Sequence, residues 1–131
     1  MRNNPVSSAR ALLDVPFRLH GRSPELGLDC VGLVAIAYGI NEDVPTGYSL
    51  RSRDPAYWER VVRARGFARR RAGWRHGDLL LVCPGPAQIH LGVWTGESLV
   101  HADAGLGRIV ETPGIPRWPV LSAWLRRKGR R

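Results

Sequence analysis

The order of its periodic segments constrains the fold of this chain more than any other sequence feature. Apolar runs of helical length fall in the first half, at about residues 7–15, 29–39 and 54–65. The second half carries short apolar or alternating runs between turn residues, which predict strands near 78–83, 88–94, 98–103, 107–111 and 119–126. Helices followed by an antiparallel meander predict an α+β fold, with the helices packed on a sheet of roughly five to six strands.

The length and composition of the chain indicate one domain. Its 131 residues are 44% hydrophobic, enough for a single core without covalent staples. We therefore expect residues 1–131 to form one domain, with loops at 16–28 and 41–53 and a frayed basic tail at 126–131. The two cysteines, Cys30 and Cys83, do not resemble a disulfide framework, and no Cys or His spacing suggests a metal site.

Cys30 stands where an apolar run of helical length begins, directly after Asp29. Aspartate is a good N-cap, and a helix N-terminus favours a thiolate over a thiol. This position therefore predicts a nucleophilic cysteine with a lowered pKa. The alternative is a small buried hydrophobe, which is the commoner fate of a free cysteine.

Two histidines occupy a predicted β-hairpin that could serve this thiol. If Thr95 and Gly96 form a two-residue turn, Trp94 faces Glu97 and His90 lies directly opposite His101. Such a pair provides a base and a residue that orients it, as nucleophilic catalysis requires. Asp103, two residues beyond His101 on the same face, is an alternative orienting group. A slip of one residue in the pairing would separate the histidines.

With Cys30, His90 and His101 in that order, the chain resembles the NlpC-type cell-wall cysteine peptidases, which have a papain-like fold. The residues similar to the family pattern are Pro16-Phe17, Gly21-Arg22-Ser23, Gly27 to Val34, His76 to Val82, Ile89 to Val93 and Leu99 to Ala102. The segment from Gly107 to Pro113 is closest to a subgroup found in phage tails and prophages. Together these motifs span roughly residues 7–126.

The resemblance implies a peptidoglycan endopeptidase that needs no metal or cofactor. Cys30, His90 and His101 would be catalytic, and the substrate would be a peptidoglycan stem peptide, cut between D-glutamate and a diamino acid. Asp29 would help to hold the free amine of the stem. Arg22 and Phe17 would also lie at the substrate site, although the family usually has a tyrosine where this chain has Phe17.

Two further departures from the family pattern bear on substrate binding. Val31 follows the nucleophile where serine is common, so a hydrogen bond to substrate would be lost. His20 occupies a position where the family usually has glycine. These differences affect the expected rate and preference more than the expected reaction class.

The formal charge of +9 favours polyanionic partners, which include cell-wall polymers and nucleic acid. No zinc-finger spacing or RNA-binding signature accompanies the charge, so a nucleic-acid module is a lesser alternative. A tail-assembly or wall-binding protein of the same fold and an amidase or acyltransferase are the others. The N-terminal residues lack a secretory signal and no run is long enough to span a membrane, so we expect cytoplasmic synthesis and delivery to the envelope by a phage-like tail, with tail proteins as partners.

Overall fold

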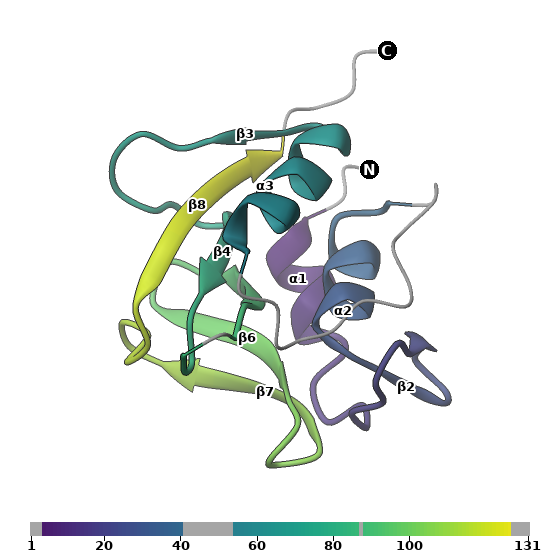
Figure 1. Ribbon diagram of the computed structural model, residues 1–131. Helices are drawn as coiled ribbons and strands as arrows, with labels where there is room; N and C mark the ends of the chain where they lie inside the picture. Colours follow the sequence, from purple (N-terminus) through teal and green to yellow (C-terminus); the bar gives the residue numbers. More distant parts are fainter. Residues whose placement is uncertain (1–3, 41–53, 87, 127–131) are drawn as a thin grey trace.

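The computed structural model describes residues 4–40, 54–86 and 88–126 (Figure 1). Three helices and a six-stranded sheet form the α+β fold that the sequence predicts. The sheet order is β3-β8-β4-β5-β6-β7, and every neighbouring pair is antiparallel. The helices are α1 (Pro5–Arg10), α2 (Cys30–Ala37) and α3 (Pro55–Ala64), and the strands are β3 (Phe67–Arg69), β4 (Leu79–Val82), β5 (His90–Trp94), β6 (Ser98–Asp103), β7 (Arg108–Pro113) and β8 (Val120–Arg126).

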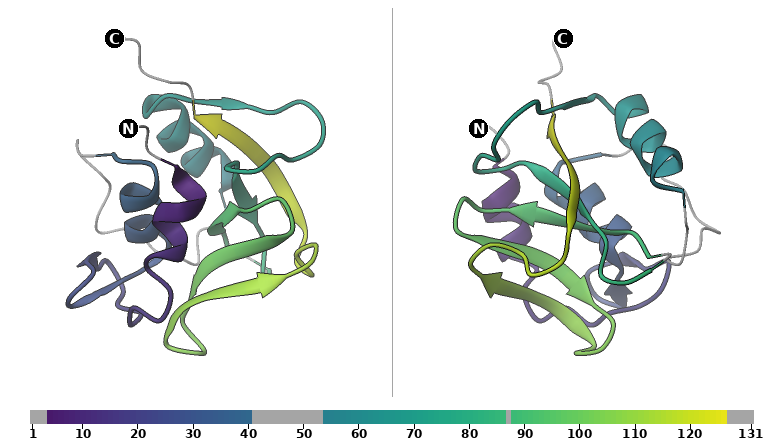
Figure 2. Two further views of the ribbon diagram at one scale, coloured as in Figure 1. Left: turned by 180° about the vertical axis from the view of Figure 1, so that it is seen from behind. Right: turned by 60° about the vertical axis from the view of Figure 1, so that its left-hand side comes forward.

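The helices lie against one face of this curved sheet, as two further views show (Figure 2). Alternate residues of each strand therefore point into different clusters. Leu81, Val93 and Val100 join the main core with the helices. Leu80 and Leu99 point to the opposite face, where they form a second cluster. That cluster is covered by the partly buried side chains of Trp74, Trp118 and Val120. Both faces of the central strands are thus buried.

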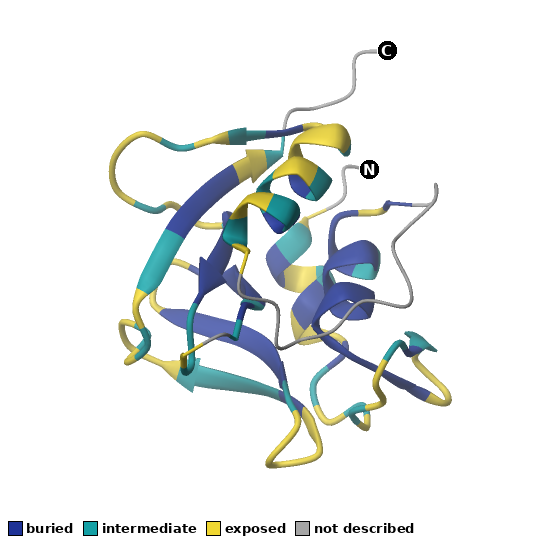
Figure 3. Ribbon diagram, in the orientation of Figure 1, coloured by how far each residue is buried: buried dark blue, intermediate teal, exposed yellow. Residues whose placement is uncertain are grey.

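Helix α2 is the most deeply buried helix (Figure 3). All its residues except Ile36 are buried, and Leu33 has no exposed surface. Gly32 allows this depth, because a Cβ atom there would lie 2.2 Å from the carbonyl oxygen of Gly21. The absence of a side chain at Gly32 lets the helix approach the preceding loop at backbone contact distance.

Side-chain caps explain where the helices begin. The side chain of Asp29 caps α2 and that of Asp54 caps α3, as the sequence indicates. Helix α1 differs from the predicted range 7–15. It starts earlier because Asn4 caps it through the N–H groups of the first turn. It ends at Arg10, and the chain then turns through Asp14, whose φ is +73°.

Three short strands were not predicted. The expected loop at 16–28 contains a two-stranded ribbon formed by β1 (Arg22–Ser23) and β2 (Gly27–Leu28). Strand β3 pairs with β8 at the edge of the large sheet. The predicted loop at 41–53 and nearly all of the predicted tail lie outside the described residues. Within the described part of the chain, no helix is both long and apolar enough to cross a bilayer.

Candidate active site

Cys30 is the first residue of α2 and is 1% exposed. Helix α2 packs on β5, the strand that begins with His90. The Cys30 thiol lies within reach of backbone hydrogen bonds at Leu91, the residue that follows His90, and at Cys30 and Val31. The fold therefore brings the predicted nucleophile to the start of the strand that carries the predicted base.

His90 and His101 are in direct contact. His90 Nε2 lies 3.2 Å from His101 Nδ1, and the two rings are nearly perpendicular. The indole of Trp118 packs edge to face against both rings, with centroids 5.7 Å from His90 and 5.2 Å from His101. The histidine pair is thus fixed by a hydrogen bond and by an aromatic neighbour.

The strand register behind this contact differs from the predicted one. Gly92, not His90, lies directly opposite His101. The hairpin turns at Gly96 and Glu97, because Thr95 N donates to Ser98 O at 2.9 Å. The pairing is shifted by two residues, which keeps both histidines on the same face of the sheet. They meet diagonally, and the absence of a side chain at Gly92 leaves room for the approach.

Sequence reasoning missed Thr112 in β7. Its Oγ1 lies 3.0 Å from Nε2 of His101, on the side of that ring away from His90. Asp103 was considered for an orienting role, but the oxygen Oδ1 of Asp103 accepts a hydrogen bond from the N–H of Leu106 at 2.9 Å. Its charge still raises the pKa of both histidines. The alternation of β7 could have revealed Thr112, since it shares a face with His101 once the register is known.

The protonation state differs from the predicted thiolate. Burial and the Asp29 carboxylate raise the pKa of the Cys30 thiol to about 12, against the lowering effect of the backbone hydrogen bonds. Burial and the neighbouring His101 lower the pKa of His90 to about 4, and burial also lowers the pKa of His101. The prediction of a lowered cysteine pKa is wrong, because desolvation outweighs the helix N-terminus. At neutral pH the resting site holds a thiol and two neutral imidazoles.

Asp29 faces the protein interior, contrary to the expected contact with a substrate amine. Its carboxylate has no exposed surface. It accepts hydrogen bonds from the N–H groups of Gly32 at 3.0 Å and His20 at 2.8 Å, and Arg22 Nη1 lies 3.2 Å away. Asp29 and Arg22 therefore tie the loop before Cys30 to the helix. His20 has a φ of +63°, which accounts for the usual glycine at its position.

Phe17 is half-buried and packs against the main core. Its backbone bridges to Leu28, two residues before Cys30, and its N–H donates to Gly107 O at 2.8 Å. The chain therefore holds Phe17 near the start of α2. Its side chain has no hydroxyl to offer a substrate.

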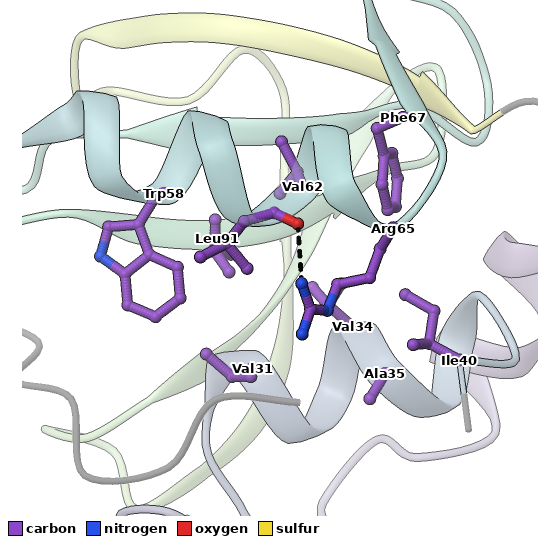
Figure 4. A pocket seen from close by; sticks show the side chains of 10 residues that line it. Val31, Val34, Ala35, Ile40, Trp58, Val62, Arg65, Phe67 and Leu91 are labelled. Carbon is purple, nitrogen blue, oxygen red and sulfur yellow. Dashed lines mark hydrogen bonds between the residues drawn. The ribbon is translucent and has the colours of Figure 1, made fainter. Parts of the chain in front are cut away.

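A small apolar cavity of about 30 Å³ lies beside the nucleophile helix (Figure 4). Val31 and Leu91, the neighbours of the two catalytic candidates, line it together with Trp58 and Val62 of α3. A cavity of this size is too small for a peptide. It marks instead the place where α2, α3 and β5 pack together.

Part of the basic charge has partners inside the fold. Arg70 forms an ion pair with the buried carboxylate of Asp78, and Arg69 lies 3.6 Å from Glu59. The guanidinium of Arg63 stacks over the ring of Trp124 at 5.0 Å. Among the described residues, no group of three His, Cys, Asp or Glu side chains is arranged to hold a metal ion.

Replacing Asp29 with asparagine is expected to lower the pKa of Cys30, because the carboxylate beside the thiol raises it. Asparagine retains a good N-cap, so the helix start should survive. The measurement is the rate of iodoacetamide alkylation against pH in a Cys83→Ser background. Asp54→Asn, which alters the cap of α3, is the matched control. An unchanged profile for Asp29→Asn would show that the carboxylate has no effect on the thiol.

The fold can now be compared with known proteins. No family model and no curated protein matches the chain. Among solved structures, the chain resembles the NlpC/p60 domain of the peptidoglycan hydrolase SagA, with 18% identity and a TM-score of 0.57 over 84% of this chain and 86% of that one. It also resembles the P60 domain of the Mycobacterium avium subspecies paratuberculosis antigen MAP1204, with 18% identity and a TM-score of 0.63 over 94% and 91%.

A third similar structure is the peptidoglycan hydrolase RipB from Mycobacterium tuberculosis. Its identity to this chain is 19% and the TM-score is 0.60, over 94% of this chain and 62% of that one. At these identities the likeness concerns the fold. The chain therefore has the papain-like α+β fold of NlpC/p60 domains.

Proposed function

We propose that this protein is a cysteine peptidase that hydrolyses peptidoglycan stem peptides. The observation that carries the proposal is the hydrogen-bonded pair of His90 and His101, set on a strand against which the Cys30 helix packs. A thiol, a base and a group that orients the base make up the set that acyl transfer to sulfur requires.

In the proposed reaction, His90 takes the thiol proton as the Cys30 sulfur attacks the scissile carbonyl carbon. The backbone N–H of Cys30, at the helix N-terminus, stabilises the oxyanion. His90 then gives its proton to the leaving amine, and a thioester forms. Water, deprotonated by His90, attacks the thioester, and the sulfur leaves as a thiol with that proton. Each proton returns to its starting atom, so the cycle is balanced.

The neutral resting state fits this sequence of steps. A thiol with a pKa of about 12 and a histidine with a pKa of about 4 do not form an ion pair at rest. Proton transfer therefore accompanies attack on the carbonyl, as in general-base catalysis. The first histidine must then hold a free lone pair toward the thiol.

We further propose that the bond cleaved joins D-glutamate to the diamino acid of the stem. The resemblance of the Cys30, His90 and His101 motifs to the NlpC-type peptidases supports this bond. The names of the SagA and RipB structures identify those proteins as peptidoglycan hydrolases, which supports the substrate class.

Delivery by a phage-like tail is a separate part of the proposal. It rests on the similarity of the segment from Gly107 to Pro113 to the tail-associated subgroup. Co-purification with tail particles after prophage induction is the expected result. Recovery of the protein apart from any particle would contradict tail delivery without affecting the chemistry.

Digestion of purified sacculi, followed by mass spectrometry, tests the enzymatic proposal. We expect stems cut to a terminal D-glutamate and a new free amine on the diamino acid. His90→Ala should lose more activity than His101→Ala, by roughly tenfold or more, because the first removes the proton carrier and the second an orienting group. Unchanged muropeptides, or equally small losses in both variants, would refute the assignment.

A further inference from the structure

Three polar side chains on neighbouring strands form a continuous hydrogen-bonded chain. His90 Nε2 lies 3.2 Å from His101 Nδ1, and His101 Nε2 lies 3.0 Å from Thr112 Oγ1. The three residues come from β5, β6 and β7. His101 is directly opposite Gly92 and Val110, so it meets both partners diagonally across the sheet.

Two proton arrangements are compatible with this chain when both rings are neutral. In the first, His90 Nε2–H donates to His101 Nδ1, and His101 Nε2–H donates to Thr112. In the second, His101 Nδ1–H donates to His90 Nε2, and the Thr112 hydroxyl donates to His101 Nε2. The first leaves a lone pair on His90 Nδ1, whereas the second places a proton there. A general base needs the lone pair, so the first arrangement is the competent one.

We propose that Thr112 is a positioning residue whose hydroxyl oxygen accepts the His101 Nε2–H and so holds His90 in the tautomer with a free Nδ1. This role rests on the proposed peptidase function. His101 is 1% exposed, so its N–H cannot turn to bulk solvent for another acceptor. A buried N–H without an acceptor is less tolerated than an acceptor without a donor. Loss of the hydroxyl therefore penalises the competent arrangement more than the other.

The surroundings of Thr112 favour its role as an acceptor. A pocket of about 60 Å³ adjoins Thr112 and His101, which is room for water that accepts the hydroxyl proton. Asp103, Arg117 and Trp118 also line this pocket. The charges of Asp103 and Arg117 act on His101 in opposite directions, the first raising and the second lowering its pKa. Trp118 packs against both rings and restrains their rotation.

The experiment measures the tautomer and the activity separately. Two-bond ¹H–¹⁵N correlation spectra of the full chain at neutral pH report which nitrogen of His90 carries the proton. In the wild type we expect the Nε2–H form. Thr112→Val should raise the share of the Nδ1–H form and lower kcat/KM on isolated muropeptides by roughly ten- to hundredfold. Thr112→Ser should restore both, and Thr112→Ala, which cannot clash, should behave like the valine variant.

Thr95→Val is the matched control, since it removes a buried hydroxyl from the turn between β5 and β6 but not from the histidine chain. It should leave the His90 tautomer unchanged. An Nδ1–H form in the wild type, or the same tautomer in wild type, Thr112→Val and Thr112→Ala, would overturn the proposal. A tautomer shift in a wild-type protein that cuts no stem peptide would support the positioning role and refute the peptidase function.

Discussion

Replacing Cys30 with alanine is expected to lower the turnover of stem peptides by at least about 10⁴-fold, because no other group can form the thioester. The substitution removes one buried sulfur atom, so the protein should remain folded. The measurement is the chromatographic rate of muropeptide cleavage, with circular dichroism as the check on folding. The prediction concerns a residue that is 1% exposed at the first position of α2.

Cys83→Ala provides the matched control for this variant. The Cys83 thiol is partly exposed, and its Sγ donates to the carbonyl oxygen of Gly85 at 3.0 Å, away from the histidine pair. We expect its turnover to stay within about twofold of the wild type, as for substitutions remote from a reacting centre. Full activity in Cys30→Ala, or a comparable loss in Cys83→Ala, would remove Cys30 from the mechanism.

Gly32→Ala is expected to destabilise the fold by about 3 kcal/mol or more. The added Cβ would lie 2.2 Å from the carbonyl oxygen of Gly21 and 3.0 Å from a methyl group of Leu28. Backbone atoms cannot rotate away as a side chain can, so the loop and α2 must separate. Urea unfolding followed by tryptophan fluorescence measures the loss.

Gly85→Ala tests whether this loss comes from the close contact and not from alanine itself. The nearest atom to a Cβ at Gly85 is Oε1 of Gln88, at 3.5 Å, an ordinary contact. Its free energy of unfolding should change by less than about 1 kcal/mol. If Gly32→Ala is equally mild, α2 does not require backbone contact with the loop.

The parts of the fold set by local chemistry could be predicted from the sequence. Asp29 and Asp54 each cap the helix that periodicity places after them. The apolar and alternating runs gave the central strands to within a few residues. The short strands β1 and β2 were missed, because two-residue strands carry too little periodicity to be recognised.

The histidine pair shows why a correct face can accompany a wrong register. The sequence places Thr95 and Gly96 in the turn, but the Thr95 side chain closes the turn with Ser98, and Gly96 takes a φ of +104° with Glu97 beside it. Local propensity does not reveal this side-chain closure. The contact survives because a two-residue shift preserves the alternation of faces.

The electrostatics of the site depended on burial that the sequence does not state. A helix N-terminus lowers the pKa of a thiol, and this much can be predicted from the position of Cys30. Desolvation and the carboxylate of Asp29 act in the opposite direction and prevail. Asp29 itself was predicted at the substrate site, yet the backbone of its own loop and helix occupies its oxygens.

The neutral, covered thiol of Cys30 also determines how the protein withstands oxidising surroundings. Hydrogen peroxide and disulfides react with thiolates, so a cysteine that stays protonated up to about pH 12 is oxidised slowly. The nucleophile becomes reactive at the moment when a carbonyl and the His90 lone pair meet it together. A wall peptidase built in this way would keep its activity in an extracellular space where a permanently ionised cysteine would be lost to sulfenic acid.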